Sequence, residues 1–223
     1  MRAAGWVAAV GVVALLVVFG LALAAREPRL SGTDYTPPAA FVTALQPGQR
    51  ACQGSELLPA DTAAVRLTLG TYGRPGPRVT LTATGPAGRP LTRGVLAAGW
   101  HQGVVSIPVR HVSSATNNVR ICVGVAPAPR ASAIALGGNV EPGEEVEIDG
   151  RSFRGVRFRV DYLRPDRESW YELLPTIAHR FSIAKAGFLR SWEWAAALLL
   201  VFASAFLAIR TVLRSVAASE RRA

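Results

Sequence analysis

The sequence has little of what most enzymes use for catalysis. Among 223 residues there are two cysteines, three histidines, one methionine and a single lysine, Lys185. It contains no CxxC pair, no HExxH or GxSxG sequence and no phosphate-cradling P-loop, so redox, zinc-hydrolase, serine-hydrolase and nucleotide-binding chemistry lack support. His101 and His111 flank one predicted strand, about 30 Å apart at ~3.3 Å per residue, too far to share a metal. We predict a protein that is not an enzyme and holds no metal or cofactor.

The carboxylates leave two alternatives open, a calcium site and a hydrolase active site. Five of them cluster near one turn: Glu141, Glu144, Glu145, Glu147 and Asp149. Carboxylate oxygens are calcium ligands, but here they alternate with Val146 and Ile148 in the manner of a solvated strand face. A hydrolase would need two carboxylates facing one cleft, drawn from this cluster or from Asp61 and Asp161.

The two cysteines, Cys52 and Cys122, permit one internal disulfide. Each lies near a predicted strand, and closing so long a loop stabilises a fold by roughly 4 kcal/mol on the chain-entropy model. We predict this disulfide, with two buried free thiols as the alternative.

The net charge of +10 comes almost entirely from arginine. The arginines are scattered singly along the sequence, whereas a nucleic-acid-binding protein gathers them in a stripe. We therefore predict no nucleic-acid partner and a mild attraction to anionic surfaces such as lipid head groups or acidic envelope polymers.

Two apolar segments bracket the chain. Gly5 to Ala25 holds no charge over 21 residues, enough at ~1.5 Å per residue to cross a ~30 Å hydrocarbon core. The second, Trp194 to Ile209, is shorter and can be extended on both sides. We predict transmembrane helices at residues 1–25 and 191–213, a linker at 26–49 and a basic tail at 214–223.

Orientation follows from the flanking residues. The arginines after the second segment outnumber the basic residues just before it, and long loops cross the membrane largely regardless of charge. Ala22-Leu23-Ala24 resembles a signal-peptide end, but the apolar core exceeds the 7–15 residues of a cleaved signal. We predict a retained signal anchor in a two-pass cell-membrane protein, with both termini cytoplasmic and the central domain extracytoplasmic; cleavage is the alternative.

The central region reads as short alternating strands separated by Gly, Pro and Asn turns. Val65, Leu67 and Leu69 share one face, and after a turn so do Val79, Leu81 and Ala83. Further strands are expected at 91–97, 104–109, 119–125 and 133–136, and a final pair at 145–148 and 155–162 flanks the hairpin signal Asp149-Gly150. Eight strands in this length predict a mainly β domain, a β-sandwich or jelly roll, over residues 50–166.

Residues 167–190 predict a short amphipathic helix in the membrane interface. Pro175 is suited to the first turn, after which apolar residues recur at helical spacing. The alternative is a helix that covers the base of the sandwich. The membrane-interface residues expected here and before the second apolar segment are Trp170, Tyr171, Phe181, Phe188, Trp192 and Trp194.

Two aromatic residues lie between glycines at strand ends, where loops would present them. Tyr72 lies in Gly70-Thr71-Tyr72-Gly73, and Trp100 lies in a loop that continues into His101 and Gln102. A flat ring beside polar donors can hold a sugar. We predict a ligand-binding site of Tyr72, Arg74, Trp100, His101 and Gln102, with Trp100 as a plug of the sandwich end as the alternative.

Part of the predicted strand pattern resembles jelly-roll carbohydrate-binding modules. The segments that carry this resemblance are Leu67 to Tyr72, Val79 to Leu81, Gly94 to Trp100, Val104 to Pro108 and Ile121 to Val123. The pattern is also similar to the exported β domains of bacterial membrane proteins of envelope-polysaccharide assembly. The resemblance covers roughly residues 50–162 and implies a glycan-binding fold.

These observations together predict a membrane-anchored, non-enzymatic envelope protein of bacteria. Its β-sandwich would bind or guide an envelope polysaccharide or lipid-linked glycan, and an integral-membrane glycosyltransferase is the expected protein partner. The alternative is an accessory or scaffold subunit of a membrane complex that binds no sugar. Small residues in the first apolar segment, including Gly5, Gly11 and Gly20, would permit the close helix packing that this alternative requires.

Overall fold

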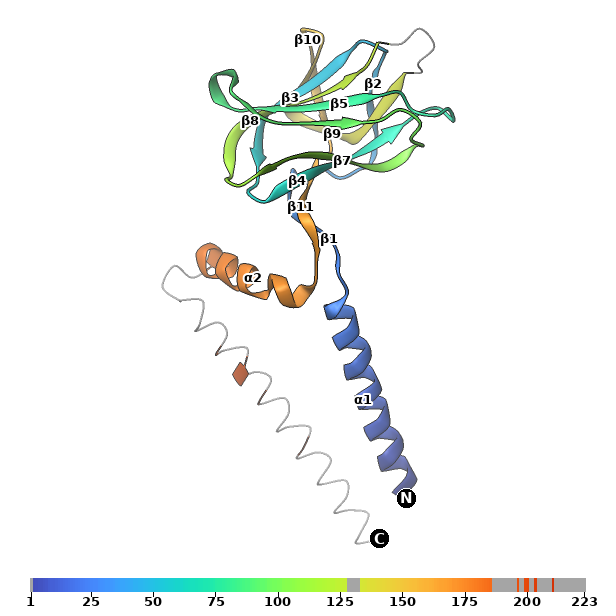
Figure 1. The fold of residues 1–223 in the computed structure, drawn as a ribbon, viewed down its shortest axis with the longest axis vertical. Helices are drawn as coiled ribbons and strands as arrows, with labels where there is room; N and C mark the ends of the chain where they lie inside the picture. Colours follow the sequence, from blue (N-terminus) through green and yellow to red (C-terminus); the bar gives the residue numbers. More distant parts are fainter. Residues whose placement is uncertain are drawn as a thin grey trace. The chain divides into compact units, whose positions relative to one another are not determined.

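The computed structural model describes residues 2–127 and 133–185, together with the isolated residues 196, 199, 200, 203 and 210. The chain divides into two compact units. One comprises residues 28–167, which we call the β domain; the other comprises residues 1–27 and 168–223. Each is described by itself (Figure 1).

The described residues form eleven strands and two α-helices, with one 3₁₀ turn at Pro86–Gly88. The helices are α1 (Arg2–Ala24) and α2 (Trp170–Lys185). The strands are β1 (Glu27–Thr33), β2 (Ala40–Leu45), β3 (Arg50–Leu58), β4 (Thr62–Gly70), β5 (Val79–Thr84), β6 (Pro90–Leu96), β7 (Gly103–Val112), β8 (Thr116–Val125), β9 (Ile134–Ile148), β10 (Arg151–Phe158) and β11 (Asp161–Glu168).

The prediction of a mainly β fold is confirmed, since eleven strands accompany only two α-helices in the described residues. The strands follow the order β1-β11-β4-β7-β6-β5-β8-β3-β9-β10, and all the described pairings are antiparallel. β4 and β9 are far apart in this order but also pair with each other, so the sheet curves round and closes on itself. The curved sheet therefore encloses one core, as in a β-sandwich.

Alternation along the strands decides which side chains enter this core. On β5, Val79, Leu81 and Ala83 are buried while the threonines between them are partly exposed. β4 repeats the pattern with Val65, Leu67 and Leu69. At roughly 25 cal/mol per Å² of apolar surface removed from water, these buried faces are the main source of the fold's stability.

The segment expected to be a linker, residues 26–49, contains two strands. β2 pairs with β9, and its Leu45 is completely buried in the core. β1 lies at one end of the strand order beside β11. Its Pro28 and Gly32 do not prevent pairing, because edge strands tolerate residues that interrupt a ladder.

The Asp149-Gly150 hairpin is confirmed. β9 ends at Ile148, β10 begins at Arg151, and these two residues pair across the turn. Both turn residues have positive φ, 47° at Asp149 and 83° at Gly150. Two positive φ values are the geometry of the tight type I′ turn that Asp-Gly favours.

The predicted disulfide is confirmed: Cys52 on β3 and Cys122 on β8 are bonded and lie directly opposite one another. Both are almost fully buried, and the described chain has no free cysteine. Such a bond persists in an oxidising environment.

The prediction of two transmembrane helices is wrong. Within the described residues, neither helix has both the length and the apolar character needed to cross a membrane. The second segment, 191–213, lies outside the described residues apart from isolated positions. The two-pass cell-membrane localisation is corrected accordingly.

α2 differs from the expected interfacial helix in where it begins. It starts at Trp170, so that Pro175 lies inside it and not at its first position. Ser169 and Glu172 form a capping box: the Ser169 backbone N–H donates to Glu172 Oε2 at 2.7 Å, and the Glu172 backbone N–H donates to Ser169 Oγ at 3.3 Å. Glu172 also pairs with Arg26 of the same unit, and both the cap and this ion pair lower the pKa of the Glu172 carboxyl.

The aromatic residues predicted for a membrane interface are described only in part. Trp170 and Tyr171 are half exposed at the start of α2. Phe181 lies in the helix but its side chain is not described, and Phe188, Trp192 and Trp194 lie outside the described residues. The assignment of this helix to a membrane interface stays a prediction.

Candidate functional site

Two loops at one end of the β domain carry the residues expected to bind a ligand, and backbone hydrogen bonds tie these loops together. The Gly76 N–H donates to the Trp100 carbonyl at 2.7 Å, and the Gly99 N–H donates to the Gly76 carbonyl at 2.8 Å. Tyr72 and Arg74 lie on the first loop, and both are exposed. The two loops therefore form one ordered platform.

Trp100 anchors this platform to the hydrophobic core. Its indole N–H donates to the Pro77 carbonyl at 2.7 Å, and its ring is partly buried against the hydrophobic core. A Cβ added at Gly76 would lie 2.1 Å from the ring, so only glycine leaves room for the indole there. The structure thus places Trp100 as a plug of the sandwich end, the alternative that the sequence left open. His101 and Gln102, which follow it, are exposed.

Sequence reasoning missed a cationic groove on the outer face of the sheet. Two adjoining hollows, of about 600 Å³ and about 540 Å³, cross strands β3, β8, β5 and β6, and both are lined by Arg50 and Arg93. Arg78 lines the first hollow and Arg110 the second. We call Arg50, Arg78, Arg93 and Arg110 the arginine face.

Strand register explains how residues so far apart in sequence come together. Thr82 of β5 lies opposite Arg93 of β6 on one side and opposite Cys122 of β8 on the other. Thr80 lies opposite Gly124, which in turn lies opposite Arg50 of β3. Because alternate residues of a strand share a face, the polar threonines of β5 lie on the face opposite the core.

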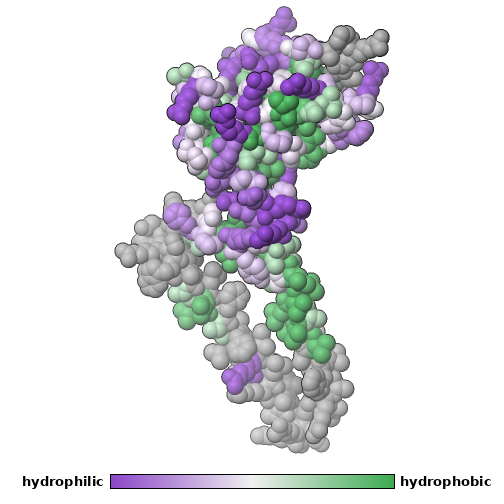
Figure 2. Space-filling view, viewed as in Figure 1, coloured by the Kyte–Doolittle hydropathy of each residue, from purple (hydrophilic) through white to green (hydrophobic). Residues whose placement is uncertain are grey.

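The guanidinium groups of the arginine face have no ion-pair partner among the described residues, although other arginines of the β domain do. Arg120 pairs with Glu147 at 2.5 Å and Arg159 pairs with Asp161 at 3.1 Å. One aspartate, Asp149, lines the groove, and its carboxylate accepts a hydrogen bond from the Arg50 backbone N–H at 3.0 Å. Four arginines against one aspartate leave this surface strongly positive. Figure 2 shows strongly hydrophilic side chains over the visible face of the β domain, with apolar ones between them.

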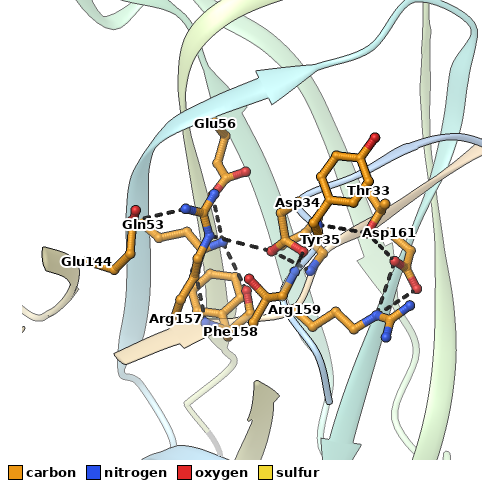
Figure 3. A network of polar contacts seen from close by, with 12 residues as sticks. Thr33, Asp34, Tyr35, Gln53, Glu56, Glu144, Arg157, Phe158, Arg159 and Asp161 are labelled. Atoms are coloured by element: carbon orange, nitrogen blue, oxygen red, sulfur yellow. Dashed lines mark hydrogen bonds and ion pairs between the residues drawn. The ribbon is translucent and has the colours of Figure 1, made fainter. Parts of the chain in front are cut away.

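A second polar cluster is buried, and Arg157 lies at its centre (Figure 3). Its guanidinium contacts Glu56 at 2.6 Å, Glu144 at 3.1 Å and Asp34 at 3.8 Å. The side chain of Arg157 is 13% exposed, that of Glu56 1% and that of Asp34 0%. Gln53 donates to Glu56 Oε1 at 2.8 Å. One cation thus faces three carboxylates in a region with little water.

The electrostatics of this cluster follow from burial. Burial raises the pKa of Glu56 to about 7, against the opposing effect of Arg157. Burial also raises the pKa of Asp34, although the Thr36 and Val160 backbone N–H groups donate to its carboxylate. Burial alone would lower the pKa of Arg157, but the surrounding carboxylates raise it overall. Tyr162, buried beside the cluster, has a raised pKa for the same reason, burial first and the nearby carboxylates second.

The carboxylates singled out in the sequence are dispersed among arginines. Glu144 contacts Arg157, Glu147 contacts Arg120, and Glu145 lies 3.9 Å from Arg154. Among the described residues there is no group of three or more His, Cys, Asp or Glu that could hold a metal ion.

The other two carboxylates considered for hydrolysis are also occupied. Asp61 lies 3.6 Å from Arg164 and 3.8 Å from His111. Asp161 accepts from Thr33 Oγ1 at 2.8 Å and pairs with Arg159. These contacts hold the fold together and give hydrolysis no further support.

No family model, curated protein or solved structure matches this chain. The resemblance to carbohydrate-binding modules stays a prediction.

Proposed function

We propose that the β domain is a non-enzymatic binding module that holds a strand of surface glycan in the groove across β3, β8, β5 and β6. The observation that carries the proposal is the pair of adjoining hollows, which share Arg50 and Arg93 and so form one continuous open channel. An open channel suits a linear polymer, whereas small-molecule sites enclose most of their ligand.

The floor of the groove offers both kinds of contact that a sugar needs. Thr80, Thr82 and Thr84 present hydroxyl groups, and two of these donate weakly to backbone carbonyls, Thr80 to Gly124 at 3.3 Å and Thr84 to Arg120 at 3.4 Å. Their oxygens keep lone pairs to accept from sugar hydroxyls. Leu91, Ala126 and Pro127 in the lining supply apolar surface for the C–H faces of the ring.

The loop platform extends the groove at one end. Arg78, which lines the first hollow, directly follows Pro77, whose carbonyl holds the Trp100 indole. The exposed Tyr72, Arg74, His101 and Gln102 of the platform are placed to meet a polymer that leaves the groove there. In this proposal Trp100 positions the platform and does not itself contact the glycan.

The test is glycan binding by the full chain, measured by calorimetry against purified neutral and acidic envelope polysaccharides. Thr82→Trp places a large ring on the groove floor and should weaken binding by tenfold or more. Val104→Trp, at a position on β7 that is already 66% exposed, is the control and should leave affinity within twofold.

Absence of saturable binding to any of these polymers, by protein whose melting curve shows it folded, would contradict the proposal. The accessory-subunit alternative would then gain weight. Its surface would be sought around Val140 and Phe153 of β9 and β10, which are 67% and 47% exposed.

A further inference from the structure

We infer that the ligand of the groove is an acidic polysaccharide, whose anionic groups pair with Arg50, Arg78, Arg93 and Arg110. The inference rests on the proposed glycan-binding function and adds the chemical class of the ligand. The evidence for this ligand class is the positive charge that lines the groove, whereas the shape of the groove supports only the binding of a polymer.

The first argument is the absence of internal partners for these arginines. Within the described part of the chain, Arg120, Arg157 and Arg159 all face carboxylates, whereas the four guanidinium groups of the arginine face do not. Like charges gathered without counter-charges repel one another and weaken the folded state. An external polyanion would remove that repulsion.

The second argument is the distribution of the arginines along the groove. Arg50, Arg78 and Arg93 line one hollow, and Arg50, Arg93 and Arg110 line the other. A single small anion would occupy one hollow and leave an arginine of the other unpaired. A chain with repeated charges that crosses both hollows meets guanidinium groups along its whole path.

The third argument is the chemistry of the guanidinium group. Its planar fork donates two parallel hydrogen bonds to a carboxylate or a phosphate, and it is weakly hydrated, so it pairs with oxyanions at low desolvation cost. Uronate carboxylates and phosphodiesters share this recognition chemistry, and both occur as repeating groups on acidic polysaccharides.

The lining also favours a polysaccharide over a nucleic acid. Proteins that bind single-stranded nucleic acid combine a positive groove with aromatic rings on which the bases stack. Among the described residues that line the two hollows there is no aromatic side chain. Threonines and short apolar side chains lie there instead.

The experiment compares four polymers of matched length on the full chain: a polyuronate, a sugar phosphodiester polymer, neutral dextran and single-stranded DNA. The double variant Arg50→Gln with Arg93→Gln removes the two arginines common to both hollows. Arg151→Gln with Arg154→Gln, on exposed positions of β10, removes the same net charge elsewhere and is the control.

At 50 mM salt we expect saturable binding of at least one acidic polysaccharide, with affinity at least tenfold lower in the Arg50/Arg93 variant and within twofold in the control. Binding should weaken steeply with added salt, because paired guanidinium groups release counterions from the polymer. Comparison of the uronate and phosphodiester polymers identifies the preferred anionic group.

The inference is overturned if dextran binds as tightly as the acidic polysaccharides, a result that leaves the proposed glycan-binding function intact. Equal loss in the two double variants would also overturn it, as would DNA binding at least as tight as that of either acidic polysaccharide. Failure of all polysaccharides to bind folded protein would refute the proposed function together with the inference.

Discussion

Replacing Arg157 by methionine should destabilise the β domain strongly, because it leaves buried carboxylates without their cation. The two carboxylates nearest to full burial, Glu56 and Asp34, are 1% and 0% exposed and both contact the Arg157 guanidinium. Removing one partner of a buried ion pair costs about 3–5 kcal/mol, and a mainly desolvated arginine that serves several carboxylates belongs in that range.

The measurement is urea unfolding of Arg157→Met at pH 8, followed by tryptophan fluorescence. Arg154→Met is the matched control: it lies on the same strand, its side chain is 90% exposed, and its nearest carboxylate contact is 3.9 Å. The control should change the free energy of unfolding by no more than about 0.5 kcal/mol.

A second comparison isolates the electrostatic cause. Adding Glu56→Gln to Arg157→Met removes one of the stranded charges and should recover part of the lost stability. The cost of Arg157→Met should also be smaller at pH 5, where the raised pKa of Glu56 leaves its carboxyl protonated. A loss below 1 kcal/mol at pH 8, or a loss that neither Glu56→Gln nor low pH reduces, would refute this account of the cluster.

Three further predictions concern stability. The pKa of Glu56 is about 7 in the folded state and about 4.5 in the unfolded state, so the folded state binds the proton more tightly. The contribution of Glu56 to stability should therefore be greatest below pH 4.5 and fall by about 3 kcal/mol as pH rises through 7. Glu56→Gln should flatten this part of a pH series of unfolding curves. Replacing both cysteines by serine should cost roughly 4 kcal/mol for a loop of 70 residues, measured by denaturant unfolding, and adding reductant to the native protein should reproduce that loss if the disulfide is its source. Gly76→Ala should push the Trp100 indole aside, at a cost of about 1–3 kcal/mol and with a shift in the tryptophan fluorescence. Gly54→Ala is the control, because its Cβ would meet open space, and it should change neither stability nor fluorescence. An unchanged fluorescence spectrum of Gly76→Ala would count against the packing described.

Local patterns in the sequence were enough for much of the β domain. The alternation of Val79, Leu81 and Ala83 marked β5 and its buried face, and the Asp149-Gly150 pair marked the β9–β10 turn. Local signals were missed for α2, where the Ser169-x-x-Glu172 capping box marks the true start of the helix. These features depend on residues within a few positions of one another.

The groove lined by the arginine face could not be predicted from such local patterns. The arginines are scattered singly along the chain, and that scatter led to the expectation of only a mild attraction to anionic surfaces. The nearest available signal was polar alternation on β5, where Thr80, Thr82 and Thr84 mark a solvent-facing strand surface beside an outward Arg93. That signal shows a polar face without showing which other strands border it.

The sequence by itself determined the strand alternation, the tight hairpin and the single disulfide partnership that two cysteines allow. Tertiary structure decided the rest: the pairing of β3 with β8 and β8 with β5 brings Arg50 to the same groove as Arg93, and the fold buries Glu56 beside Arg157, 101 residues away. The physical reason is that backbone propensity and hydrophobic periodicity act over a few residues. The charge of a surface and the pKa of a buried carboxyl depend instead on which distant strands become neighbours and on how much water they exclude.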